Sequence, residues 1–139
     1  MALKMNAAEL SAFLRLEFPQ VADEFEMVEL SATRLDVALR VQDKHLRPGG
    51  TVSGPSMFAL ADVAAYLHIL ALIGPKALAV TTNCGIDFMR KPAPKDLIAK
   101  ARLLKLGKSL AVGDVLLFSE GMEMPVAHAN VTYSIPSKG

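Results

Sequence analysis

Asp62 is the residue whose surroundings in the sequence most suggest chemistry. It is the only acidic residue between Asp43 and Asp87, and it lies two turns into the most apolar stretch of the chain, residues 57–74. A carboxylate buried alone is costly, so it needs hydrogen-bond donors, a partner charge or a solvent-filled cleft. Such a residue either fixes a helix against a strand or serves as an acid, base or nucleophile, and its position alone leaves both interpretations open.

The start of the same predicted helix offers hydrogen-bond donors. The tetrapeptide SGPS occupies residues 53–56, where proline suits the first turn and Ser53 can cap it. The free N–H of Gly54, at the positive end of the helix dipole, could polarise a carbonyl or bind an anion. Gly54 and Asp62 are about 12 Å apart along the helix axis, so only a second subunit could bring the two to one carbonyl group.

The remaining reactive side chains form no recognisable centre. The spacings of His45, His68 and His128 match no metal-binding motif, so we assign no metal. Cys84 is the single cysteine, which excludes a disulfide framework, and no histidine near it in the sequence suggests an activated thiol.

Several basic residues stand where a chain turn is expected. Arg90 and Lys91 end a predicted strand, and Lys108 lies at a predicted hairpin turn. Such side chains usually form a solvated surface, but they could also bind phosphate groups.

Composition limits the class of protein. The chain has 139 residues, of which 52% are hydrophobic, and carries 15 basic against 14 acidic residues. These values predict one globular domain over residues 1–139 and indicate no nucleic-acid partner. The first 18 residues include Glu9, Arg15 and Glu17, so they do not resemble a signal peptide. Asp62 and His68 argue against a membrane span in residues 57–74, and we expect a cytoplasmic protein.

The hydrophobic pattern predicts the elements that must position these residues. A capped amphipathic helix is expected over residues 6–17, and two alternating strands over 24–41 with a turn near 31–33. A loop over 42–54 leads to a helix over 55–73, and extended segments follow at 77–90, 97–106, 111–120 and 126–135. The long helix is apolar on nearly every side, which predicts an α+β fold in which a curved antiparallel sheet wraps a central helix. The exposed sheet edges of such a fold favour an oligomer.

Two segments resemble one known family. SGPSMFALADVAAYL at residues 53–67 and VTTNCGIDFMRKPAPKDLIAKARLLKLGKS at 80–109 resemble hotdog-fold acyl-CoA thioesterases of the phenylacetate-degradation (PaaI-like) type. The resemblance covers about residues 22–135. It implies a long helix wrapped by an antiparallel sheet, assembled as a dimer and often as a tetramer.

The resemblance also implies roles for single residues. Asp62 falls on the catalytic acid, which acts as general base or as nucleophile, and Gly54 falls on the glycine whose N–H polarises the thioester carbonyl from the other subunit. Thr81 falls near a Ser/Thr position that orients the water, and Ser53 would support the same site.

Three departures from the family pattern affect the start of the helix. Ser53 replaces the usual histidine, Arg47 replaces the usual asparagine six residues earlier, and Pro55 replaces the second glycine. We assign Arg47, Pro55, Arg90, Lys91 and Lys108 to substrate binding. Arg47 could pair with the Asp62 carboxylate or with an acidic group of the substrate. In the family the segment of Arg90 and Lys91 often lies near coenzyme A, and Lys108 could bind its phosphates.

The sequence therefore predicts an acyl-CoA thioesterase that releases a free acid and coenzyme A. Coenzyme A is part of the substrate, and no separate cofactor is expected. The missing histidine and asparagine keep open an acyl-CoA-binding module that does no chemistry. A hotdog dehydratase or hydratase is a third possibility, but it would need a His–Asp or His–Glu pair, and no histidine is well placed for one.

Overall fold

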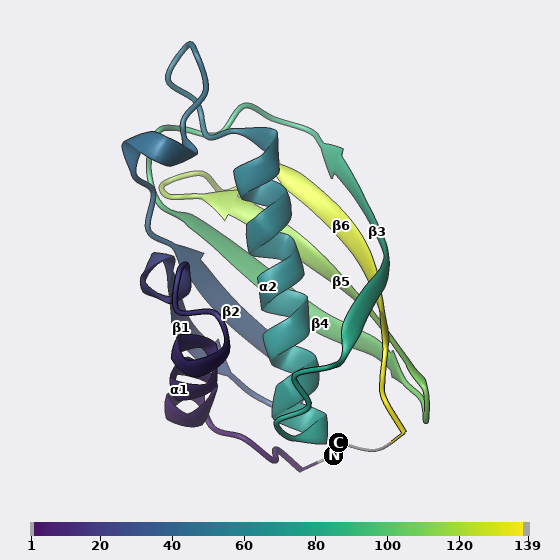
Figure 1. Cartoon of the computed structure of the whole chain (residues 1–139). Coiled ribbons are helices and arrows are strands. Elements are labelled where there is room, and N and C mark those ends of the chain that lie inside the picture. The colour runs from purple at the N-terminus through teal and green to yellow at the C-terminus, as the bar shows by residue number, and fades with distance from the viewer. Residues whose placement is uncertain (1, 138–139) are drawn as a thin grey trace.

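The computed structural model describes residues 2–137 and contains one sheet and two α-helices (Figure 1). The helices are α1, Ala7–Glu17, and α2, Gly54–Ile73. The strands are β1 Phe25–Leu30, β2 Arg34–Leu39, β3 Val80–Phe88, β4 Leu97–Leu106, β5 Leu110–Ser119 and β6 Ala127–Ser134. This order of elements is the one that the hydrophobic pattern predicts.

The six strands form one antiparallel sheet that curves around α2. Their order is β1-β2-β4-β5-β6-β3, and α2 lies along the inner face of the sheet (Figure 1). This arrangement is the hotdog fold, so the predicted fold class is confirmed. Two strands, β1 and β3, form the edges of the sheet within the described chain.

Helix α2 is stabilised by burial on nearly all sides. The Ser53 hydroxyl caps its first turn by accepting the N–H of Ser56, and the helix ends at Gly74, whose φ of 96° is a left-handed conformation that favours glycine. All side chains from Leu60 to Leu72 are buried in the core except those of Asp62 and Val63, which are half-buried. By length and composition alone α2 could cross a membrane, but 67% of its apolar window is buried inside the protein.

Helix α1 packs beside α2 and covers one flank of it. Asn6 and Glu9 form a capping box with each other's backbone N–H groups, and Leu10 and Leu14 are buried in the common core. The ring of Phe18, at the end of α1, meets the ring of Tyr66 on α2 edge to face, with 5.8 Å between centroids. The N-terminal segment is therefore part of the folded domain.

Several predicted boundaries were wrong by a few residues. The predicted strand over 77–90 is shorter, because Ala79 donates to the Lys76 carbonyl in a turn and the N–H groups of Met89 and Arg90 both meet the Val126 carbonyl. The predicted loop over 42–54 contains one turn of 3-10 helix, Asp43–His45, in which the His45 ring also bonds to Glu24 at 2.7 Å. These local hydrogen bonds do not follow from hydrophobic periodicity.

A buried histidine predicts how stability depends on pH. His68 on α2 is 1% exposed, its Nε2 atom has no hydrogen-bond partner, and burial lowers its pKa below the usual 6.5. The unfolded chain therefore binds a proton on this residue at a higher pH than the folded chain does. Stability should fall as pH drops below about 6.5, by at most about 1.4 kcal/mol per pH unit from this group.

Urea unfolding at pH 7.5 and pH 5.5 measures this effect. In a His68→Leu variant the difference in unfolding free energy between the two pH values should be smaller than in the wild type. His45 and His128 are present in both proteins and serve as internal controls. An equal difference in the two proteins would contradict the assignment.

Candidate active site

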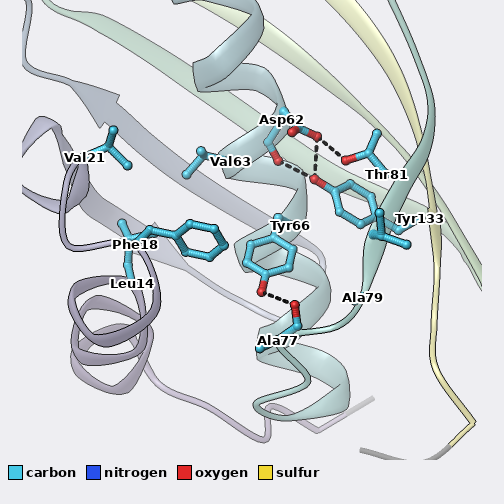
Figure 2. A pocket seen from close by; sticks show the side chains of 11 residues that line it. Leu14, Phe18, Val21, Asp62, Val63, Tyr66, Ala77, Ala79, Thr81 and Tyr133 are labelled. Atoms are coloured by element: carbon cyan, nitrogen blue, oxygen red, sulfur yellow. Dashed lines mark hydrogen bonds between the residues drawn. The ribbon is translucent and has the colours of Figure 1, made fainter.

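Asp62 lies beside two hydroxyl groups that come from two neighbouring strands. The Thr81 hydroxyl donates to Oδ1 of Asp62 at 2.7 Å, and the Tyr133 hydroxyl is 2.5 Å from the same oxygen and 2.9 Å from the Asp62 carbonyl oxygen (Figure 2). No described residue donates to the second carboxylate oxygen, Oδ2. One oxygen is thus held in place, and the other is available to a water molecule or a substrate.

The sheet determines why these two hydroxyls meet. Thr81 on β3 and Tyr133 on β6 are register partners, so their side chains emerge side by side toward α2. A bulge follows Thr81 before the pairing resumes at Asn83, which places Thr81 and Cys84 on the same, helix-facing side. Asp62 on α2 contacts this pair of side chains near the start of β3.

Tyr133 is held in its donating form. Burial raises its pKa far above the usual range, and the charge of Asp62 and their hydrogen bond raise it further. Asp62 itself is half-buried. A neutral hydroxyl donor beside a carboxylate stabilises the negative charge without adding a second one.

Gly54 begins α2 and has an unused N–H group. Among the described residues, no backbone or side-chain acceptor meets this N–H. Pro55 follows it and has no N–H to compete, and the Phe88 ring lies against the glycine, 3.4 Å from where a Cβ atom would stand. The sequence predicts Gly54 as a donor to a carbonyl, and its free N–H is consistent with that role.

Ser53 is occupied by the capping of its own helix. Its hydroxyl accepts the N–H of Ser56 at 3.3 Å and donates to the Ser56 hydroxyl at 2.9 Å. Ser53 thus has the helix-capping role that its place before α2 predicts. Its support of catalysis stays a prediction, without a contact to Asp62.

The predicted substrate-binding residues fall into two groups. Arg47, Arg90 and Lys91 lie around one hollow of about 450 Å³ that also includes Gly54, and Pro55 lies beside an adjoining hollow with Phe88. Arg90 is partly fixed, since it donates to the Pro125 carbonyl at 2.8 Å. Arg47 lies in the loop before α2, near Gly54. It makes no ion pair with Asp62 in the described chain.

Lys108 lies elsewhere. It lines a hollow with Lys4 and Lys76 at the far end of α2, next to Ile73. Within one chain it is not brought together with the cations around Gly54. Its predicted contact with the substrate is therefore not supported by the arrangement of a single subunit.

Sequence reasoning missed both tyrosines of the site. Tyr133 follows the alternation of buried residues along β6, which includes Ala129 and Val131, so the pattern reveals only that it points inward. Its contact with Asp62 depends on the pairing of β6 with β3. Tyr66 lies one turn after Asp62 on α2, and its hydroxyl donates to the Ala77 carbonyl at 3.2 Å. In residues 2–137 no three His, Cys, Asp or Glu side chains converge as metal ligands would.

Comparison with known proteins identifies the family. The family model of the thioesterase superfamily matches residues 49–134, a range that includes both Gly54 and Asp62. This chain is a member of the thioesterase superfamily. Its membership supports thioester hydrolysis as the general chemistry of the protein.

Three similar proteins extend this comparison. A protein of Silicibacter sp. TM1040, provisionally classed as a thioesterase, is 59% identical, with a TM-score of 0.92 over 98% of this chain and 95% of that one. A variant of the phenylacetic acid degradation protein PaaI from Thermus thermophilus is 27% identical, with a TM-score of 0.72 over 85% of this chain and 99% of that one. A provisionally classed esterase of Pseudomonas aeruginosa is 33% identical over 104 residues, 74% of this chain and 76% of that protein. The predicted PaaI-like resemblance is thus confirmed.

Removing one hydroxyl from the Asp62 site tests its role as a positioning group. Thr81→Val keeps the shape of the side chain but removes the hydrogen bond to Oδ1, so kcat for thioester hydrolysis should fall roughly tenfold. Thr81→Ser keeps the hydroxyl and should stay within about threefold of the wild type. Tyr133→Phe should behave like Thr81→Val.

Steady-state kinetics on purified variants separate this role from a packing role. A positioning group that acts through Asp62 should change kcat and leave KM nearly unchanged. Equal kcat values for Thr81→Val and Thr81→Ser would contradict it.

Proposed function

We propose that the protein is an acyl-CoA thioesterase, which hydrolyses a thioester to a free acid and coenzyme A. The observation that carries the proposal is the Asp62 carboxylate, with Oδ1 held by Thr81 and Tyr133 and Oδ2 free, in a member of the thioesterase superfamily. A fixed carboxylate with one free oxygen can serve as a general base or as a nucleophile.

Either route gives a balanced reaction. As a base, Asp62 takes a proton from water while the water oxygen attacks the thioester carbonyl, and the proton then passes to the leaving thiolate. As a nucleophile, Asp62 forms a mixed anhydride and expels the thiolate, and water then hydrolyses the anhydride. In both cases negative charge develops on the carbonyl oxygen, where the Gly54 N–H of a second subunit would stabilise it.

A homodimer supplies the geometry that one chain lacks. Gly54 and Asp62 are about 12 Å apart along α2, too far to act on one carbonyl group. Strand β3 is a sheet edge next to both residues, and its Val80 and Phe88 side chains are 55% and 51% exposed. Pairing of two β3 edges would cover these side chains and bring α2 of one subunit toward α2 of the other. A tetramer would be a dimer of such dimers.

The cations near Gly54 suit the coenzyme A part of the substrate. Arg47, Arg90 and Lys91 line the hollow that includes Gly54, and coenzyme A carries phosphates that such side chains bind. The proposal needs no other cofactor. A cytoplasmic location, without a nucleic-acid or membrane partner, agrees with the composition of the chain.

Replacing Asp62 tests the reaction. Asp62→Asn should lower kcat for acyl-CoA hydrolysis by about 10²–10⁴-fold, because the amide can neither accept the proton nor attack the carbonyl. Asp87→Asn is a matched control, since Asp87 is exposed on the opposite face of β3, and it should keep wild-type activity.

Release of free thiol from a panel of acyl-CoA esters measures both variants. Equal activity of the Asp62→Asn and wild-type proteins would overturn the role of Asp62. Tight binding of acyl-CoA without any hydrolysis would instead favour the binding module, for which the replacement of the family histidine and asparagine by Ser53 and Arg47 is the supporting observation.

A proline substitution tests the Gly54 N–H. Gly54→Pro removes this donor at a helix position that tolerates proline, and kcat should fall about 10²–10³-fold. Gly54→Ala keeps the N–H and should fall much less. A smaller loss for proline than for alanine would contradict the oxyanion role.

Mixed dimers test whether the site spans two subunits. Equal amounts of Asp62→Asn and Gly54→Pro chains, unfolded and refolded together, should recover about one quarter of wild-type activity, since half of the dimers would contain one intact site. No recovery, with heterodimers present by tag pull-down, would indicate that each site uses a single chain.

A further inference from the structure

A cavity of about 200 Å³ adjoins Asp62, and the aromatic side chains of Phe18 and Tyr66 line it (Figure 2). The Asp62 carboxylate lies at one end of the lining residues. At the other end the Tyr66 hydroxyl is bonded to the Ala77 carbonyl. The lining between them is mainly apolar and includes Val63 and Ala79.

The outer wall of this cavity comes from outside the family-matched region. Leu14, Phe18 and Val21 line it, and all three precede residue 49, where the match to the superfamily begins. These residues belong to α1 and the turn after it. The N-terminal segment therefore helps to set the size of the cavity.

The wall is rigid. Leu14 is 2% exposed and anchors α1 in the core, and the Phe18 ring stands edge to face against Tyr66. Tyr66 also contacts Phe13 and Tyr133, with centroid distances of 6.4 Å and 5.8 Å. A ring held by three aromatic neighbours and a hydrogen bond resists displacement by a longer ligand.

The cavity is also selective for charge. Of the residues that line it, Asp62 is the one carboxylate and none is basic, and burial raises the pKa of the Tyr66 and Tyr133 hydroxyls, which stay neutral. No cation lines the cavity to pair with a second carboxylate on a ligand. A charged acyl group would lose its hydration there and face the negative charge of Asp62.

We propose that this cavity binds the acyl group of the substrate and limits it to a compact, uncharged group. A cavity of roughly 150 Å³ can hold benzene, so 200 Å³ fits about six to eight carbons beyond the carbonyl, as a short chain or as one aromatic ring. Phe18 and Tyr66 are the residues that set this limit. The inference rests on the proposed function, since it takes the thioester carbonyl to lie at Asp62.

Hydrolysis of a series of acyl-CoA esters tests the size limit. The series contains butyryl, hexanoyl, octanoyl, dodecanoyl, phenylacetyl and succinyl esters. We expect kcat/KM to rise by roughly fourfold per methylene group up to hexanoyl or octanoyl, with phenylacetyl comparable. Dodecanoyl should be at least tenfold poorer than octanoyl, and succinyl at least a hundredfold poorer than hexanoyl. Equal rates for dodecanoyl and octanoyl, or for succinyl and hexanoyl, would overturn the proposal.

Two variants change the cavity in opposite directions. Phe18→Ala opens the outer wall and should raise the dodecanoyl-to-hexanoyl ratio of kcat/KM at least tenfold. Ala79→Leu fills the cavity and should lower octanoyl hydrolysis at least tenfold while butyryl hydrolysis stays within about threefold. Leu16→Ala is the matched control, because Leu16 lies on α1 and is 77% exposed, and its profile should be that of the wild type.

Binding of thioethers separates this inference from the proposed reaction. S-hexyl- and S-dodecyl-coenzyme A cannot be hydrolysed, and calorimetry gives their affinities for the same variants. Wild-type hydrolysis with a length profile that neither variant shifts would overturn the cavity proposal and leave the function standing. No hydrolysis, with the predicted shifts in thioether affinity, would overturn the reaction and support the cavity. Neither hydrolysis nor thioether binding would overturn both.

Discussion

The hydrogen bonds on Oδ1 of Asp62 are the interaction on which the rest of the structure depends. A carboxylate in the middle of the most apolar helix of the chain can remain charged only where donors meet it. Thr81 and Tyr133 supply those donors from two adjacent strands, at 2.7 and 2.5 Å. The wrapping of the sheet around α2 is what brings strands β3 and β6 to this turn of the helix (Figure 1). The same two bonds leave Oδ2 free, so one arrangement holds the half-buried carboxylate in place and leaves its second oxygen accessible.

Helix α2 holds apart the two groups that the proposed reaction needs, the Gly54 N–H and the Asp62 carboxylate. Its start carries the free N–H of Gly54, beside the cations that suit the proposed phosphate-bearing leaving group, and its third turn carries Asp62. Because the helix is rigid, the distance between these groups cannot close within one chain. In the proposed dimer, the β3 edge that lies beside both groups is the surface along which a second copy would supply the missing half.

The N-terminal segment adds a third component to the site. Helix α1 is fixed to the core by Leu10 and Leu14, and the chain that follows it brings Phe18 against Tyr66. The family-matched region thus carries the proposed acid and donor, whereas residues that precede it line the cavity next to Asp62. Reaction and selectivity would then be encoded in different parts of the chain.

The sequence by itself determined much of this picture. The apolar run broken by one aspartate and opened by SGPS defined α2, its capping residue and the candidate acid, because helix signals and hydrophobic periodicity are local properties. Motif resemblance added the family and the position of Thr81. Only the tertiary structure decided that Tyr133 meets Asp62, that Ser53 is engaged in capping, and that Lys108 lies far from Arg90. These relations depend on strand order and register between segments dozens of residues apart, and local patterns do not record which buried residue of one strand meets which residue of a distant helix.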